Sequence, residues 1–415
     1  MSQMHGNRSE HPPAPLGHEP RPGIVSEIGR ELLWLKLLRS VSLAIRPERL
    51  FVAAVMLVLM ALVVRVPGQE WWGGESWSAG VDAVSRASWS DIAFGAVTLD
   101  MARVTSPFLQ LDGGLGLLWQ EHQWTMLLVA PFVLLIWGVG GCVISRVAAC
   151  DVAQGLLVPW VEGRRFAFAR TGSILFALAA PLILVAAIWL VLAVGGWVLF
   201  SLQWVNVLGG MFYVLFLVAA AIAVVVLAAY VAGFPLLVPA IACEGGDGID
   251  AIARAYPYVF GKPLRYAAYG LVAILLATIA TTVINYGAGA VMHFASGAAT
   301  TWTGERTAGL IAAATDTTPG AVPDLPAHER ATVALVRFWR NLVMVIVGAF
   351  AISYFFCSST VLYMIMRRVC DGQDMGEVWM PGMIEGTMTM TMEARATVGG
   401  VSVRPGSDAD AADET

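Results

Sequence analysis

Six long apolar blocks, separated by polar segments, dominate the pattern of hydrophobic and polar positions along the chain. They cover residues 50–66, 124–145, 173–200, 207–232, 266–290 and 341–366. A helix needs about 20 residues to cross a hydrocarbon core of about 30 Å, with a lower limit of about 17. The pattern therefore predicts an all-α, polytopic membrane protein with six transmembrane helices arranged in hairpin units.

The fourth block allows two interpretations, because no charged residue occurs from Val205 to Cys243. Two spans with a tight turn would fit this length. We prefer one span with a kinked exit, since Pro235 and Pro239 interrupt helical hydrogen bonding. With six spans and both termini inside, 18 Lys and Arg residues lie on the interior side and 7 on the exterior side. That bias is the one expected of cytoplasmic segments.

Residues 24–380 are expected to form one membrane domain between two disordered tails. Residues 1–23 are rich in proline and almost lack large apolar side chains, and residues 381–415 are polar. Such segments cannot bury enough apolar surface to offset the entropy of ordering.

Basic, amphipathic segments precede the spans, and residues 24–46 are the first of them. Ile24, Ile28, Leu32 and Leu35 fall on one helical face, while charged residues interrupt the apolar run. A helix of this kind favours the membrane–water interface, so we expect it to lie there on the cytoplasmic side.

Two long segments are predicted as exterior loops, residues 67–123 and 291–337. The first has five tryptophans, and Trp favours the headgroup level, so we expect short helices on the membrane surface. The second is rich in Ala, Thr, Gly and Pro. We expect it to be flexible apart from a helix near 304–314 and another helix that starts at Pro326.

A short motif recurs where three helices reach the predicted cytoplasmic side. A cysteine is followed there by an acid, at Cys150-Asp151, Cys243-Glu244 and Cys370-Asp371. In addition, a basic residue and a proline precede both span one, at Pro47, and span five, at Pro263. These recurrences predict an internal repeat of three helical hairpins.

The second exit carries a candidate cluster of charged residues: Glu244, Asp247, Asp250 and Arg254. We interpret its acids mainly as caps, with Asp247 bound to the free N–H groups of an interfacial helix and Asp250 in its first turn. A calcium-binding loop is the functional alternative, although such a loop needs more oxygen ligands than these three acids supply. A lipid-modifying enzyme would need polar groups that converge at the interface, and Glu244, Asp247 and Arg254 are the one candidate cluster for that role.

Polar side chains at helical spacing form a candidate path through spans five and six. Thr278, Thr282 and Asn285 lie four and three residues apart, and Tyr354 and Ser358 lie four apart. They could line a route for a neutral solute. The alternative is hydrogen bonding between helices, which is common for such residues in lipid.

Composition narrows the possible functions. Hydrophobic residues make up 58% of the chain and charged residues 13%, with a net charge of −5. Soluble domains average about 25% charged residues, and nucleic-acid binding requires a basic surface, so neither class fits. The scattered cysteines and histidines predict no metal or other cofactor. The centres of the spans lack the ionisable residues that mark proton or ion paths.

Residues 244–266, EGGDGIDAIARAYPYVFGKPLRY, resemble a segment of a bacterial family of uncharacterised multi-spanning inner-membrane proteins. Weaker matches are at residues 141–146, 164–168 and 363–372, and the resemblance extends over about residues 30–380. It implies the same membrane architecture in a bacterial inner membrane. It implies no activity.

The sequence thus predicts a non-enzymatic membrane protein that organises the membrane or scaffolds a complex. A transporter or channel for a neutral or lipidic solute is the first alternative, and a lipid-modifying membrane enzyme is the second. The expected partners are membrane lipids, other membrane proteins or a second copy of the chain, and no nucleic acid.

Overall fold

The computed structural model describes residues 33–65, 77, 81, 84, 98, 100–155, 157–201, 204–315, 325–380 and 383. These residues form helices and no β-strand. The long helices are α3 (Pro47–Arg65), α6 (Met101–Gln154), α8 (Thr171–Ser201), α10 (Tyr213–Glu244), α12 (Pro263–Thr300) and α14 (Ala327–Asp371). The short ones are η1 (Leu33–Leu37), α2 (Leu38–Ala44), α7 (Trp160–Ala169), α9 (Asn206–Met211), α11 (Gly248–Gly261) and α13 (Glu305–Thr315). Six of the described helices are long and apolar enough to cross a membrane, as predicted.

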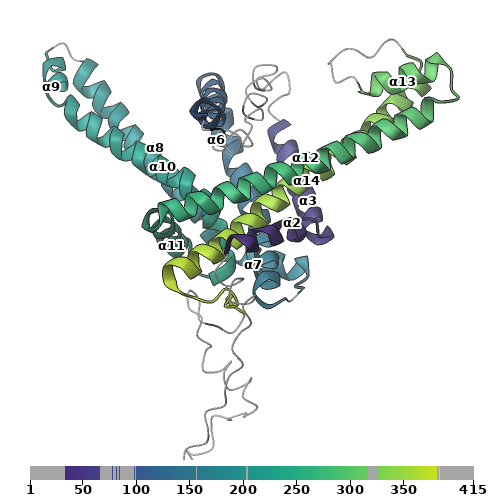
Figure 1. Ribbon diagram of the computed structural model, residues 1–415. Coiled ribbons are helices and arrows are strands. Elements are labelled where there is room, and N and C mark those ends of the chain that lie inside the picture. Colours follow the sequence, from purple (N-terminus) through teal and green to yellow (C-terminus); the bar gives the residue numbers. More distant parts are fainter. Residues whose placement is uncertain are drawn as a thin grey trace, which may run out of the picture.

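The long helices pair as three hairpins, α3 with α6, α8 with α10 and α12 with α14. Figure 1 shows the hairpins diverging upward from a common lower region, with α9 and α13 at two of the tips. We call the diverging parts the arms. The base comprises the buried ends of α6, α10 and α14, within residues 138–151, 233–246 and 349–367, together with α2, α7 and α11.

Each hairpin repeats one order of elements, which confirms the predicted three-unit organisation. A short helix at the base (α2, α7 or α11) leads into the first long helix, and the second long helix returns to the base. Pro47 and Pro263 open α3 and α12, where the missing N–H of proline costs nothing. The returning helices end at Gly155, Gly245 and Gly372, each with φ between 64° and 70°. Glycine adopts this left-handed conformation without steric cost.

Helix α10 illustrates how a returning helix divides into an arm and a base. Between Tyr213 and Ala232 most side chains are exposed, whereas residues 236–246 are all buried. Pro235 and Pro239 lie inside one uninterrupted helix. From Tyr213 onward the fourth apolar block therefore forms one span, as we preferred from the sequence, and its first residues belong to the short helix α9.

Several predicted boundaries need correction. Residues 101–121 of the predicted loop 67–123 are helical and join the second span at His122, which has non-helical dihedral angles (φ −135°, ψ 38°). Helices α12 and α14 extend into the predicted loop 291–337 and leave only residues 301–326 between them. The helix predicted near 304–314 and the start at Pro326 are both confirmed.

The predicted interfacial helix in residues 24–46 is described only from Leu33 onward. Its inner face differs from the prediction, because Leu37 and Leu43 are buried while Leu35 is exposed. The chain is a 3₁₀-helix from Leu33 to Leu37 and α-helical only from Leu38, so the uniform α-helical spacing behind the prediction does not hold there. The predicted tails 1–23 and 381–415 lie outside the described residues, apart from Met383.

Close packing of α6 against α14 leads to a first prediction. A Cβ atom on Gly141 would lie 2.1 Å from the ring of Phe356, which is buried and also packs on Trp137. We expect Gly141→Ala to lower the free energy of unfolding in detergent by about 1–3 kcal/mol, because a buried ring cannot yield without strain. Gly116→Ala, in open space on the same helix, is the matched control and should be neutral or stabilising by up to about 1 kcal/mol. Equal destabilisation by both changes would contradict the packing.

Candidate functional site

The base contains buried ionised side chains where the three hairpins meet. Glu244, in the last turn of α10, is 3% exposed. Its carboxylate forms an ion pair with Arg254 of α11 and accepts a hydrogen bond from the Tyr363 hydroxyl of α14. Nη1 of the fully buried Arg367 lies 4.0 Å from Glu244 Oε1. One carboxylate therefore joins α10, α11 and α14.

The other two acids of the predicted cluster do not join Glu244. Asp247 and Asp250 are exposed. Asp247 occupies the N-cap position of α11 with extended dihedral angles, but its side chain makes no capping hydrogen bond. The predicted side-chain cap is therefore wrong. Asp250 lies in the first turn as expected, where the helix dipole favours an acid. Within the described part of the chain, no three His, Cys, Asp or Glu residues are grouped to hold a metal ion.

A second ionic cluster surrounds Asp151 in the last turn of α6. Asp151 Oδ2 lies 2.6 Å from Arg49 Nη2 and 2.9 Å from Arg46 Nη1, and Oδ1 lies 3.6 Å from Arg39 Nη2. Asp151 and Arg49 are both 2% exposed, whereas Arg39 and Arg46 are half-exposed. The cluster ties the second helix of the first hairpin to α2 and to the start of α3. We did not predict it, although the repeated Cys-acid motif marks Asp151 and Glu244 as equivalent positions.

A third set of contacts closes the base around Trp379, in the segment that follows α14. The backbone N–H of Trp379 donates to Cys243 O at 2.8 Å. Arg146 Nη2 donates to Trp379 O at 2.6 Å and Nη1 donates to Ala242 O at 3.0 Å. The guanidinium of Arg170 lies 4.8 Å from the Trp379 ring centroid, within cation–π range. These two arginines bind the C-terminal segment to α6, to α10 and to the junction between α7 and α8.

The third copy of the Cys-acid motif also makes a contact between two helices, here within the third unit. Asp371, in the last turn of α14, accepts a hydrogen bond from the Tyr258 hydroxyl of α11. Burial raises the pKa of Tyr258, and the hydrogen bond to Asp371 raises it further. In all three copies the acid after the cysteine therefore binds a side chain from another helix.

The raised pKa of Tyr258 gives a prediction for alkaline pH. Its contribution to stability is complete below the unfolded-state pKa of about 10 and is lost as pH rises toward the higher folded-state pKa. We expect the free energy of unfolding of the intact chain to fall more steeply between pH 9 and 11 than that of Tyr258→Phe. Tyr213→Phe, an exposed tyrosine in an arm, is the control and should keep the steep slope. Identical slopes for the intact chain and Tyr258→Phe would contradict the assignment.

The structure does not gather the candidate polar path into one route. Thr278 donates to a backbone oxygen four residues earlier, and Ser358 donates to one three residues earlier. Tyr354 is buried and its hydroxyl donates to Ala273 O at 2.9 Å, which joins α14 to α12. Thr282 and Asn285, both on α12, are exposed.

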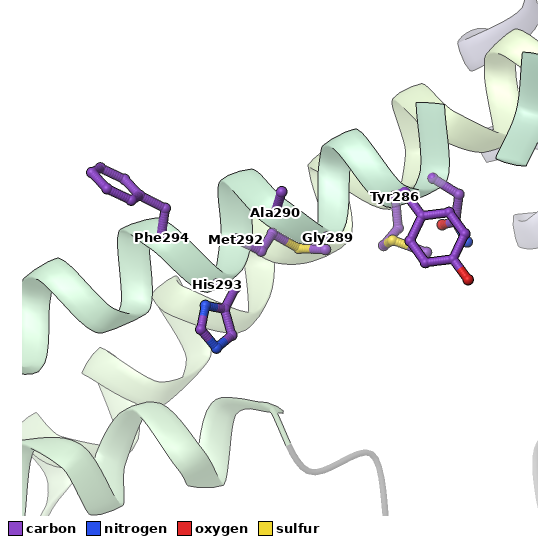
Figure 2. Close-up of a pocket in the computed structure, with 8 residues that line it drawn as sticks. Tyr286, Gly289, Ala290, Met292, His293 and Phe294 are labelled. Atoms are coloured by element: carbon purple, nitrogen blue, oxygen red, sulfur yellow. The ribbon is translucent and has the colours of Figure 1, made fainter. Parts of the chain in front are cut away.

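Asn285 does line a shallow hollow between α12 and α14, together with Tyr286, His293 and Met344. Figure 2 shows Phe294 projecting from the opposite side of α12 to His293. Tyr286 and Phe294 are 77% and 79% exposed. The hollow is thus an open surface between two helices rather than an enclosed binding cavity.

Comparison with family models, curated proteins and solved structures found no match. The resemblance of residues 244–266 to the inner-membrane family stays a prediction. Functional inference therefore depends on the geometry of this chain.

Proposed function

We propose that the chain is a non-enzymatic integral membrane protein, with both termini on the cytoplasmic side of a bacterial inner membrane, that organises the membrane or scaffolds a membrane complex. One observation carries the proposal. The buried charges of the base bind one another and the backbone, whereas the arms expose apolar surface. The polar groups thus stabilise the fold, and the arms are available to lipid and to other helices.

The dimensions of the arms support a membrane location. From Tyr213 to Ala232 the arm of α10 has about 20 residues and a length of about 30 Å, which equals the thickness of a hydrocarbon core. Trp204 and Trp302, near two of the tips, are 89% and 97% exposed. Tryptophan favours the headgroup level, so these residues fit the far membrane surface.

The mostly exposed arms favour scaffolding over transport. Only 6% of the most apolar stretch of α10 and 11% of that of α12 are buried within the chain. Helices in lipid associate through close packing and interhelical hydrogen bonds. Such exposed helices therefore offer extended surfaces to helices of other membrane proteins.

Photo-cross-linking in native membranes, combined with a flux assay, tests the proposal. A photoreactive residue at Trp197 or Tyr286, both exposed in arms, should form adducts of discrete mass with other membrane proteins. The same residue at exposed Leu264, by the base, should not. Purified protein in liposomes should move no solute. Absence of protein adducts at both arms, or solute movement that Asn285→Leu abolishes, would contradict the proposal.

A further inference from the structure

The half-exposed arginines near Asp151 carry more positive charge than their carboxylate neutralises. Three guanidinium groups, from Arg39, Arg46 and Arg49, surround one carboxylate. Arg49 Nε is buried without a hydrogen-bond partner, and Arg46 Nη1 lies beside Asp151 without a well-directed hydrogen bond. Arg39 and Arg46 are 50% and 39% exposed and can therefore reach an external anion.

A second basic group is joined to α3, the helix of Arg49, through a pair of aromatic rings. The Phe51 ring of α3 packs on Trp160 of α7, with ring centroids 5.6 Å apart. The guanidinium of Arg164 lies 5.2 Å from the Trp160 centroid. Residues 33–51 have four cations and one acid, Glu48, and residues 160–170 have three cations and one acid, Glu162. Both of these acids are exposed, and the combined surface stays strongly positive.

We propose that the surface formed by Arg39, Arg46, Phe51, Trp160 and Arg164 binds the phosphate group of an anionic phospholipid. Arginine forks bind phosphate oxygens through paired, charge-assisted hydrogen bonds. Trp160 is of the residue type that favours the headgroup level. Clusters of Lys and Arg at the cytoplasmic surface bind anionic lipids.

Exposed apolar side chains beside the arginines identify a lipid rather than a free phosphate as the ligand. Ile45, Phe51 and Val161 are 52%, 53% and 40% exposed. These apolar side chains can contact the acyl chains of a bound lipid. A soluble phosphate ester has no acyl chain and would leave them without a contact. The inference rests on the proposed membrane function. It adds that the base binds anionic phospholipids.

Native mass spectrometry of the full chain in detergent tests the site. The lipids are phosphatidylglycerol and phosphatidylcholine with identical acyl chains, and glycerol phosphate represents the free headgroup. We expect phosphatidylglycerol to bind about tenfold more tightly than phosphatidylcholine. The double variant Arg39→Gln/Arg46→Gln should remove most of that preference. Equal affinity for the two lipids, or glycerol phosphate binding as tightly as phosphatidylglycerol, would overturn the inference.

Matched variants separate the site from general basic charge and from misfolding. Arg265→Gln/Arg330→Gln removes the same charge at two exposed positions outside the proposed surface and should leave the preference within about twofold. Arg164→Gln, which leaves the contacts of Asp151 intact, should lower phosphatidylglycerol affinity about threefold. If the control pair removed the preference as fully, or if Arg164→Gln had no effect, the site would be wrong. Extraction of the chain by alkaline carbonate would instead contradict the proposed membrane function.

Discussion

Replacing Asp151 with leucine should destabilise the protein by about 3–5 kcal/mol, because it leaves the buried charge of Arg49 without its carboxylate. Arg49 and Asp151 are both 2% exposed and 2.6 Å apart. The loss should appear as a lower midpoint when the protein in mixed micelles is titrated with a denaturing detergent. Reaction of the buried, free cysteines Cys142 and Cys150 with a thiol-reactive dye reports unfolding.

Two further variants test the ionic origin of that loss. Arg49→Met/Asp151→Leu should recover most of the stability, because apolar replacement of a whole buried pair is often neutral. Glu48→Gln, at an exposed carboxylate one residue from Arg49, should change stability by less than about 0.5 kcal/mol. If the double variant were no more stable than Asp151→Leu, a packing defect would explain the loss better than an unpaired charge.

Replacing Glu244 with leucine should cost about 3 kcal/mol and release α11 from the base. The change removes an ion-pair partner of Arg254, the acceptor of the Tyr363 hydroxyl and a carboxylate 4.0 Å from Arg367. A buried arginine without compensating charge is strongly destabilising. Hydrogen exchange should therefore rise over residues 248–261, in addition to the fall in the unfolding midpoint.

The control for Glu244 comes from the same stretch of sequence. Asp250→Asn changes an exposed carboxylate on α11 and should alter stability by less than about 0.5 kcal/mol. Glu244→Gln, which keeps an acceptor for Tyr363, should cost less than Glu244→Leu. An Asp250→Asn variant as unstable as Glu244→Leu would contradict the separation of the two acids.

The number and order of the helices could be predicted because they depend on local pattern. Apolar runs of sufficient length, Pro47 and Pro263 at helix starts, and the recurring Cys-acid motif all occur within a few neighbouring residues. The contacts of the base could not be predicted in the same way. Arg49 and Asp151 are 102 positions apart, and Glu244 and Tyr363 are 119 apart. Periodicity identifies the inner face of one helix but not the helix that packs on it.

Charged residues near the ends of apolar blocks illustrate the same limit. From the sequence, Arg146 and Arg367 are charges at the cytoplasmic ends of their spans. In the structure they are buried, with 5% and 0% of their surface exposed. Converging helix ends bury them, and backbone oxygens from other segments accept their hydrogen bonds. For the candidate polar path, the sequence suggested a shared route where the structure has local hydrogen bonds. The spacing that aligns Thr278 and Thr282 also brings a hydroxyl within reach of the carbonyl one turn earlier, and Thr278 makes that local bond.

The most direct test of the central claim is labelling of single introduced cysteines from the two sides of the membrane. Trp204→Cys and Trp302→Cys report two of the tips, and Leu264→Cys reports the base, at positions that are all at least 85% exposed. Replacing Cys370 by serine removes the one half-exposed native thiol. A membrane-impermeant maleimide should label both tips in vesicles of one orientation and Leu264→Cys only in vesicles of the opposite orientation. Labelling of tips and base from the same side would contradict a protein whose three hairpins cross the bilayer from one shared base.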